Sequence, residues 1–225
     1  MIQHTYIEFL GLELADPLTF ISDLLMTLVA FYCGHKIFYA HNNKYAKFVG
    51  MFFFFMGASS LIGGTGHLLD LYFGKTAHLI AWTVQGLSII FIELASIRLL
   101  SRKYRHLLRT LVYAFFGVFI SRLFDVQHFD IVKVNASVGL IGFAVLIHLV
   151  AYFQYKKAVF LRIPLAISLF LIPAAIHGLG FQLNAWINHN VISHLALLPC
   201  YYMLYYGCDL VAAELTKSKT LQILQ

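Results

Sequence analysis

The chain carries little charge for its length. Only 12% of its 225 residues are Asp, Glu, Lys or Arg, whereas a water-soluble domain carries roughly 25%. Hydrophobic residues make up 60% of the sequence, and the mean hydropathy is +0.79. The apolar residues come in runs of about 20, which a core facing water could not cover. We therefore expect a protein whose solvent is the lipid bilayer.

Cysteine is scarce, and so is positive charge near the N-terminus. The three cysteines lie inside apolar runs without the spacing of a metal or redox motif, so we expect buried thiols. Residues 1–16 contain three acidic side chains and no Lys or Arg, so we predict no cleavable signal peptide. The net charge of +6 does not indicate nucleic acid binding, because Lys and Arg lie between the apolar runs.

Seven apolar stretches are long enough to cross a membrane. Only helices and closed barrels satisfy the backbone in lipid, and the stretches lack the strict alternation of barrel strands. The sequence therefore predicts one all-α domain over residues 1–225, a seven-helix transmembrane bundle. The expected spans are 17–39, 45–73, 76–101, 104–123, 131–155, 159–182 and 191–215.

Lys and Arg gather in alternate loops, which sets the expected orientation. They flank the first, third and fifth loops and follow the last span, whereas the other loops are mainly acidic. The positive-inside rule then places the N-terminus outside and the C-terminus in the cytoplasm. We expect a multi-pass protein of the plasma (inner) membrane of a bacterium. The cations are Lys36, Lys44, Lys47, Arg98, Arg102, Lys103, Arg105, Arg109, Lys156, Lys157, Arg162, Lys217 and Lys219.

Four ionisable residues are expected in one layer near the outer face. Counted at 1.5 Å per residue, Asp23, His67, His177 and His194 each lie ~6–9 Å inside their spans. Each costs about 2.5–3.5 kcal/mol to insert, so a shared water-accessible pocket would explain them. In a ring-like bundle the first, second, sixth and seventh helices are neighbours. The alternative is scattered hydrogen bonding between helices. Ser22 is expected to point elsewhere on a regular helix.

The segment Gly63-Gly64-Thr65-Gly66-His67 has three glycines in four residues. Glycine is a poor helix former, so the segment permits close backbone approach or local unwinding beside His67. The alternative is a packing seam of small residues for another helix. Asp70 is three residues from His67, on the same helical face, and could orient its imidazole.

The start of the last span carries two histidines. His189 and His194 are five positions apart, so they diverge by about 140° on a continuous helix. They can share an ion only if the helix begins between them, for which Asn190 is a plausible N-cap. His177 is an equally good third ligand. Three histidines with an open position are typical of catalytic zinc, and Asp23 could act as general base or hold the water.

Some of these residues resemble a known family. Ser22-Asp23, Gly63-Gly64-x-Gly-His67, Trp82 and Asn188-His189-Asn190-x-x-x-His194 resemble an uncharacterised bacterial seven-helix family. That family is distantly similar to the CREST membrane hydrolases, which include alkaline ceramidases and adiponectin-receptor-like proteins. The resemblance spans most of the chain and implies zinc held by His67, His189 and His194.

The chain departs from the CREST pattern at three places. Gly63 stands where CREST proteins have a Ser, and His78 stands near the position of their Asp. The histidines of the last span are five residues apart instead of four. Asp23 would have to replace the missing Asp.

Together these patterns predict a zinc-dependent intramembrane hydrolase of a lipid amide or ester, with its site near the outer face. One alternative is a non-enzymatic metal- or ligand-binding receptor or sensor, and another is a proton or metal transporter. A retinal protein is excluded because residues 191–215 contain no lysine. Glu93, His148 and Asp209 lie deeper in the bundle, and we interpret them as structural or tuning residues.

Overall fold

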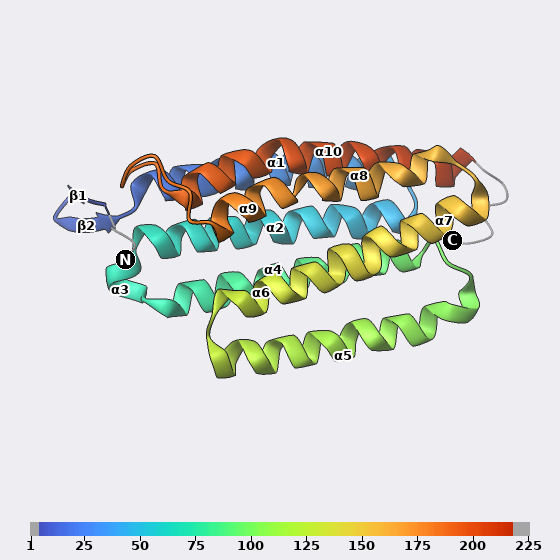
Figure 1. Ribbon diagram of the computed structural model, residues 1–225, viewed down its shortest axis with the longest axis horizontal. Helices are drawn as coiled ribbons and strands as arrows, with labels where there is room; N and C mark the ends of the chain where they lie inside the picture. Colours follow the sequence, from blue (N-terminus) through green and yellow to red (C-terminus); the bar gives the residue numbers. More distant parts are fainter. Residues whose placement is uncertain (1–4, 218–225) are drawn as a thin grey trace.

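The computed structural model describes residues 5–217 and forms an elongated bundle of nearly parallel and antiparallel helices (Figure 1). Within those residues, seven helical segments are long and apolar enough to cross a membrane, which confirms the predicted all-α fold. The segments are α1 (Pro17–Ala40), α2 (Lys44–Leu68), α4 (Lys75–Ile97), α5 (Arg102–Val126), α6–η1–α7 (Phe129–Tyr155), η2–α8–α9 (Ala158–Gly178) and α10 (His189–Lys217). Lys219, a cation expected after the last span, lies outside the described residues.

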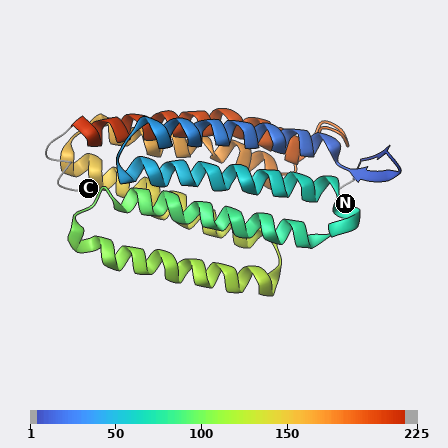
Figure 2. The ribbon, with the colours of Figure 1, turned by 180° about the vertical axis from the view of Figure 1, so that it is seen from behind.

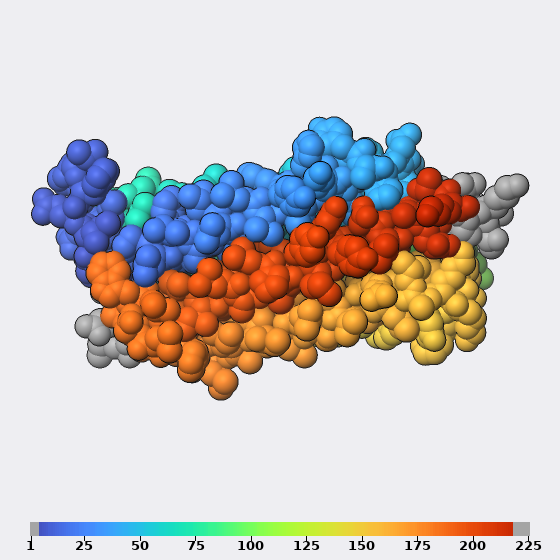
Figure 3. All heavy atoms as spheres, turned by 90° about the horizontal axis from the view of Figure 1, so that it is seen from above, coloured from blue at the N-terminus to red at the C-terminus, as the bar shows by residue number. Residues whose placement is uncertain are grey.

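A small β-hairpin precedes the first span, which the prediction of helices alone missed. Strands β1 (Tyr6–Phe9) and β2 (Leu12–Ala15) pair antiparallel. Leu10 and Gly11 join them with φ angles of 52° and 76°, which are positive as in a type I′ turn. The hairpin projects from one end of the bundle (Figure 3), which we call the hairpin end.

The base of the hairpin is fixed by Asp16. The sequence predicts Asp16 as the N-cap of α1, and α1 does begin with Pro17 at its first position. However, Asp16 adopts a left-handed conformation and makes no side-chain cap. Its carboxylate accepts from the backbone N–H of Thr5 at 3.1 Å instead, so it ties the strand to the helix.

Six spans form a ring and the fourth lies outside it. α1 packs between α2 and α10, α2 packs on α4, and α4 contacts α6 and η1, which lead through α8 back to α10. Among the elements of residues 5–217, α5 packs substantially against α4 and α6 alone. It forms the edge of the bundle in Figure 2. The expected adjacency of the first, second, sixth and seventh spans is therefore present, in a ring of six instead of seven.

Two spans are irregular. The fifth consists of α6 (Phe129–Ser137), the π-helix η1 (Val138–Val145) and α7 (Leu146–Tyr155). The sixth consists of η2 (Ala158–Leu161), α8 (Arg162–Leu169) and α9 (Leu171–Gly178). Pro173 has no N–H for the carbonyl of Leu169, and the thiol of Cys200 lies 3.6 Å from that oxygen.

Several boundaries differ from the prediction: α4 ends at Ile97 instead of 101, and α5 extends to Val126 instead of 123. α2 ends at Leu68, and residues to the expected end at 73 form the separate short helix α3 (Asp70–Phe73). α9 ends at Gly178 instead of 182. α10 begins at His189, before the expected start at 191.

Most of the basic residues that flank the described loops lie at the end opposite the hairpin, which we call the tail end (Figure 1). The turns after α1, α4 and α7 lie there, together with the end of α10. This is the asymmetry on which the orientation prediction depends. Which end faces the cytoplasm stays a prediction.

Candidate functional site

Five helices place ionisable side chains at the hairpin end. α1 contributes Asp23, α2 contributes His67 and α9 contributes His177. α10 contributes His189 and His194, while α4 adds a histidine that the sequence interpretation did not select. His194 lies within electrostatic range of the other three histidines named here. The expected polar layer therefore exists.

His194 is held by two consecutive residues of α1. Its Nδ1 lies 3.0 Å from Ser22 Oγ and 3.6 Å from Asp23 Oδ1. Ser22 is 2% exposed and Asp23 is 4% exposed, so both contacts are shielded from solvent. Ser22 was expected to point elsewhere, and that prediction was wrong. Two consecutive residues of α1, Ser22 and Asp23, therefore contact the same imidazole.

The hydrogen bonds of Ser22 favour one tautomer of His194. The Ser22 hydroxyl donates its one proton to the carbonyl oxygen of Thr19, at 2.7 Å. Ser22 Oγ then acts as the acceptor toward His194, which favours the tautomer with the proton on Nδ1. The other ring nitrogen, Nε2, is left as the acceptor of the neutral ring. That tautomer suits a metal ligand or a proton acceptor.

Asp23 has an unsatisfied oxygen. Among the described residues its buried Oδ2 has no hydrogen-bond partner. A buried polar atom without a partner costs free energy, so it needs an explanation such as a bound ion, water or proton. The predicted site residue therefore lies beside His194 with an oxygen free for such a ligand.

His177 and His189 form a pair. Their ring centroids are 5.1 Å apart, and the ring planes meet at 80°. The predicted N-cap Asn190 was wrong, because Asn188 Oδ1 accepts from the backbone N–H groups of Asn190 and Val191 instead. α10 therefore begins at His189, which places that imidazole on its first turn, toward α9.

His67 lies against His78 of α4, with ring centroids 4.7 Å apart. His78 Nε2 is 3.7 Å from Asp70 Oδ1. The sequence interpretation assigned Asp70 to the orientation of His67, and the structure places it near His78. His78 was noted only as a departure from the CREST pattern; its spacing of 11 residues from His67, across a short turn, was the available signal.

Aromatic rings connect the two histidine pairs. Trp82 lies 5.9 Å from His78 and 5.7 Å from Phe129, centroid to centroid. Phe129, at the start of α6, lies 5.4 Å from His177. The imidazoles thus lie against an aromatic wall built by α4 and α6 on one side, and against α1 on the other.

The glycines before His67 form a packing seam, and α2 is not unwound there. A Cβ added at Gly64 would lie 2.6 Å from Asp23 Cβ, and one added at Gly66 would lie 3.0 Å from Ala77 Cβ. One face of the seam admits α1 and the other admits α4. Close approach, one of the predicted alternatives, therefore brings Asp23 and His67 into the same layer.

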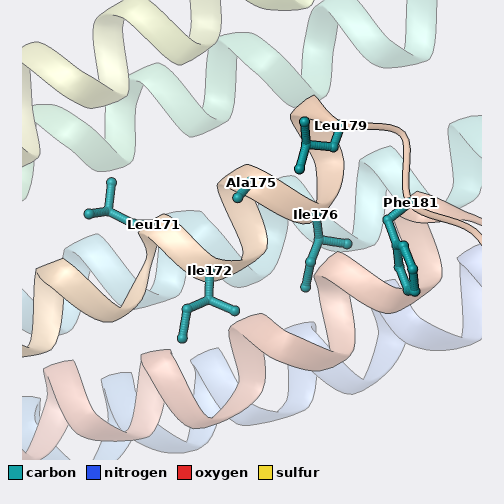
Figure 4. A pocket seen from close by; sticks show the side chains of 6 residues that line it. All are labelled: Leu171, Ile172, Ala175, Ile176, Leu179 and Phe181. Carbon is teal, nitrogen blue, oxygen red and sulfur yellow. The ribbon is translucent and has the colours of Figure 1, made fainter.

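An apolar groove runs beside the cluster along α9 (Figure 4). Its volume is about 550 Å³, and Ile176, which directly precedes His177, lies next to Phe181 in it. The remaining lining residues are Leu171, Ile172, Ala175 and Leu179. Four of its six lining side chains are more than half exposed, so the groove is open on the outer surface of α9.

The deeper polar residues are partly paired. His148 Nε2 lies 3.1 Å from the Tyr45 hydroxyl, and Asp209 Oδ1 lies 2.8 Å from His41 Nε2. These contacts agree with the interpretation of both as structural residues. Glu93 is 4% exposed and packs against Gly139 of η1.

The histidines do not form a ready metal site. Across residues 5–217, no three His, Cys, Asp or Glu side chains converge closely enough to hold a metal ion. The structure joins Asp23 to His194 and His177 to His189, and brings His67 next to His78. Zinc and the catalytic role of Asp23 therefore stay predictions.

The chain was compared with known proteins. No curated protein and no solved structure matches it. The similarity to CREST hydrolases thus rests on the motif residues alone. A family model matches residues 18–212, from the second residue of α1 to near the end of α10. Since this match covers most of the chain, the protein belongs to DUF6962, a family of unknown function.

Proposed function

We propose that the protein is a zinc-dependent hydrolase of a membrane lipid, with the metal bound at the hairpin end. The observation that carries the proposal is the contact of His194 Nδ1 with Ser22 and Asp23. This contact favours the proton on Nδ1, which leaves the Nε2 lone pair available to a metal. An imidazole fixed in this way matches the usual arrangement of a zinc ligand whose second nitrogen is hydrogen-bonded.

His67 and His177 are the best partners for His194. Both act on it electrostatically, ahead of His189. His189 lies on the same helix and diverges from His194 by about 140°, whereas the other two come from separate helices. Three imidazoles from α2, α9 and α10 would give the three-ligand layout of catalytic zinc. Side-chain rotation of His67 and His177 would complete it.

Asp23, Ser22 and the groove of α9 would each have a different role in the hydrolysis. Bound zinc would supply a water whose pKa is about 7. Asp23, with Oδ2 unpaired, would accept the proton of that water. Ser22 would keep His194 in its ligand tautomer, and the apolar groove of α9 would hold the acyl chain of a lipid amide or ester.

The first test is metal analysis of the purified chain. The wild type is expected to retain one zinc per chain, which His67→Ala and His194→Ala lose. His106, an exposed residue of α5, supplies the control, because His106→Ala should retain the metal. A wild-type chain without zinc would refute the proposal.

The second test separates an enzyme from the alternatives. Asp23→Asn should keep its zinc and lose the hydrolysis of lipid amides and esters in mixed micelles. Zinc retention with no turnover in the wild type would favour a receptor or sensor. Proton or zinc uptake by vesicles containing the wild-type chain would favour a transporter.

A further inference from the structure

Four arginines converge at the tail end, where α4 turns into α5. Arg98 follows α4, and Arg102, Arg105 and Arg109 lie on the first two turns of α5. Arg98 acts electrostatically with Arg102 and Arg109, and all three act on Arg105. This arginine cluster lies at the opposite end of the bundle from the histidines, so it is independent of the proposed hydrolase site.

The protein backbone holds Arg105 and Arg109 in place. Arg105 is only 4% exposed, and its guanidinium donates to the carbonyl oxygens of Leu100 at 2.9 Å and Arg98 at 3.1 Å. Arg109 Nε donates to the carbonyl oxygen of Arg105 at 3.2 Å. Guanidinium groups fixed in this way are pre-organised, so a ligand would lose less side-chain entropy on binding them.

The cluster concentrates positive charge against electrostatic preference. Burial and the guanidinium groups of Arg109 and Arg102 lower the pKa of Arg98. α5 also begins with basic residues, although the positive end of a helix dipole favours acidic ones. Ser101 makes no side-chain cap there. The charges of these arginines and the positive end of the helix dipole have the same sign, which is typical of a site for an anion.

Other basic residues at the tail end have different surroundings. Lys157 forms an ion pair with Glu214, and Lys47 donates to the Phe38 carbonyl and lies over its ring. The positive-inside rule accounts for the sign of charge at this end. The rule depends on the number of cations in a loop, so it does not require four guanidinium groups to lie close together between α4 and α5.

We propose that the arginine cluster binds the phosphate of an anionic phospholipid in the adjoining leaflet. Guanidinium pairs with phosphate oxygens through parallel hydrogen bonds. A lipid fits better than free phosphate because α5 is the most exposed of the spans and lies at the edge of the bundle. Leu107 and Leu111 of α5 are 64% and 39% exposed, so acyl chains can extend along it from the headgroup.

The test is lipid retention by the full chain, measured by native mass spectrometry after exchange into detergent containing phosphatidylglycerol or phosphatidylcholine. The wild type should retain phosphatidylglycerol in preference to phosphatidylcholine. The double variant Arg102→Gln/Arg109→Gln should bind phosphatidylglycerol at least about tenfold more weakly. Lys36→Gln/Lys44→Gln removes the same charge from the same end and should bind like the wild type.

Three results would overturn the assignment. One is equal retention of the two lipids by the wild type, which does not depend on any variant folding. Another is an equal loss of binding in the two double variants, which would indicate non-specific attraction. The third is displacement of phosphatidylglycerol by millimolar inorganic phosphate, which would assign the cluster to a soluble anion.

Discussion

The packing of α1 against α2 depends on the absence of a side chain at Gly64. A Cβ at that position would lie 2.6 Å from Asp23 Cβ, and both atoms are fixed to the backbone of their helices. Gly64→Ala should therefore push α1 and α2 apart beside His194. Gly63→Ala is the matched control, since its added Cβ would meet Ala81 Cβ at an ordinary 3.7 Å.

The magnitude follows from two opposing contributions. Alanine in a helix interior is favoured over glycine by roughly 0.5–1 kcal/mol, and both variants gain this. Overpacking of a tight contact costs about 1–3 kcal/mol, and only Gly64→Ala incurs it. We expect Gly63→Ala to be at least as stable as the wild type. Gly64→Ala should be less stable than Gly63→Ala by about 1–3 kcal/mol, or ~2–12 °C in Tm.

The assay is thermal unfolding in detergent, followed by circular dichroism, with all three proteins prepared in the same micelles. Zinc content of each protein provides a second measurement, because Gly64→Ala also displaces the residues that hold His194. A Tm for Gly64→Ala equal to or above that of Gly63→Ala would show that the helices are not in the contact described, and would refute the reasoning.

Two further predictions concern the deeper half of the bundle. Gly139→Ala should lower stability by about 1–3 kcal/mol, since its Cβ would lie 2.2 Å from Ile89 Cγ2, whereas Gly142→Ala has open space and should not. Equal melting temperatures for this pair would contradict the packing of η1 on α4. Tyr45→Phe should cost about 1–3 kcal/mol in chemical denaturation, because it removes the hydrogen-bond partner of Nε2 of buried His148, whose Nδ1 keeps its contact with the Ala144 carbonyl. The exposed Tyr113→Phe should change stability by less than about 0.5 kcal/mol, and a similar loss in both would argue against the hydrogen bond.

The existence of the seven spans was predictable because length and hydropathy suffice to identify them. The residues at which the spans end were harder to predict. Residues 70–73 are apolar after the first position, so the sequence extends the second span across them, although α2 ends at Leu68. The apolar residues Leu179 and Phe181 likewise extend the sixth span, but Gly180 with its φ of 64° breaks the backbone between them. No pattern in the sequence predicted the π-helix η1.

The layer of the candidate site was predictable, whereas its contacts were not. Counting residues from the helix ends places Asp23 and His194 at similar depth, and they do meet. The rotation of each helix about its axis is set by packing, which the sequence does not express directly. Ser22 was therefore judged to point elsewhere, although His194 lies against both it and its neighbour. Asn188 and Asn190 are equally suitable N-caps in sequence, and only the former accepts the bonds.

The wide turns of η1 make the fifth span tolerant to a change of length. In an α-helix each residue turns the chain by about 100°, so a deletion within a span rotates every later side chain onto the wrong face. A π-helix accommodates an additional residue through its i→i+5 bonds. Loss of one residue there could convert wide turns to α-helical ones while α6 stays against α4 and α5, and α7 against α8. A variant of this chain with one residue deleted from η1 is thus expected to retain the same ring of helices.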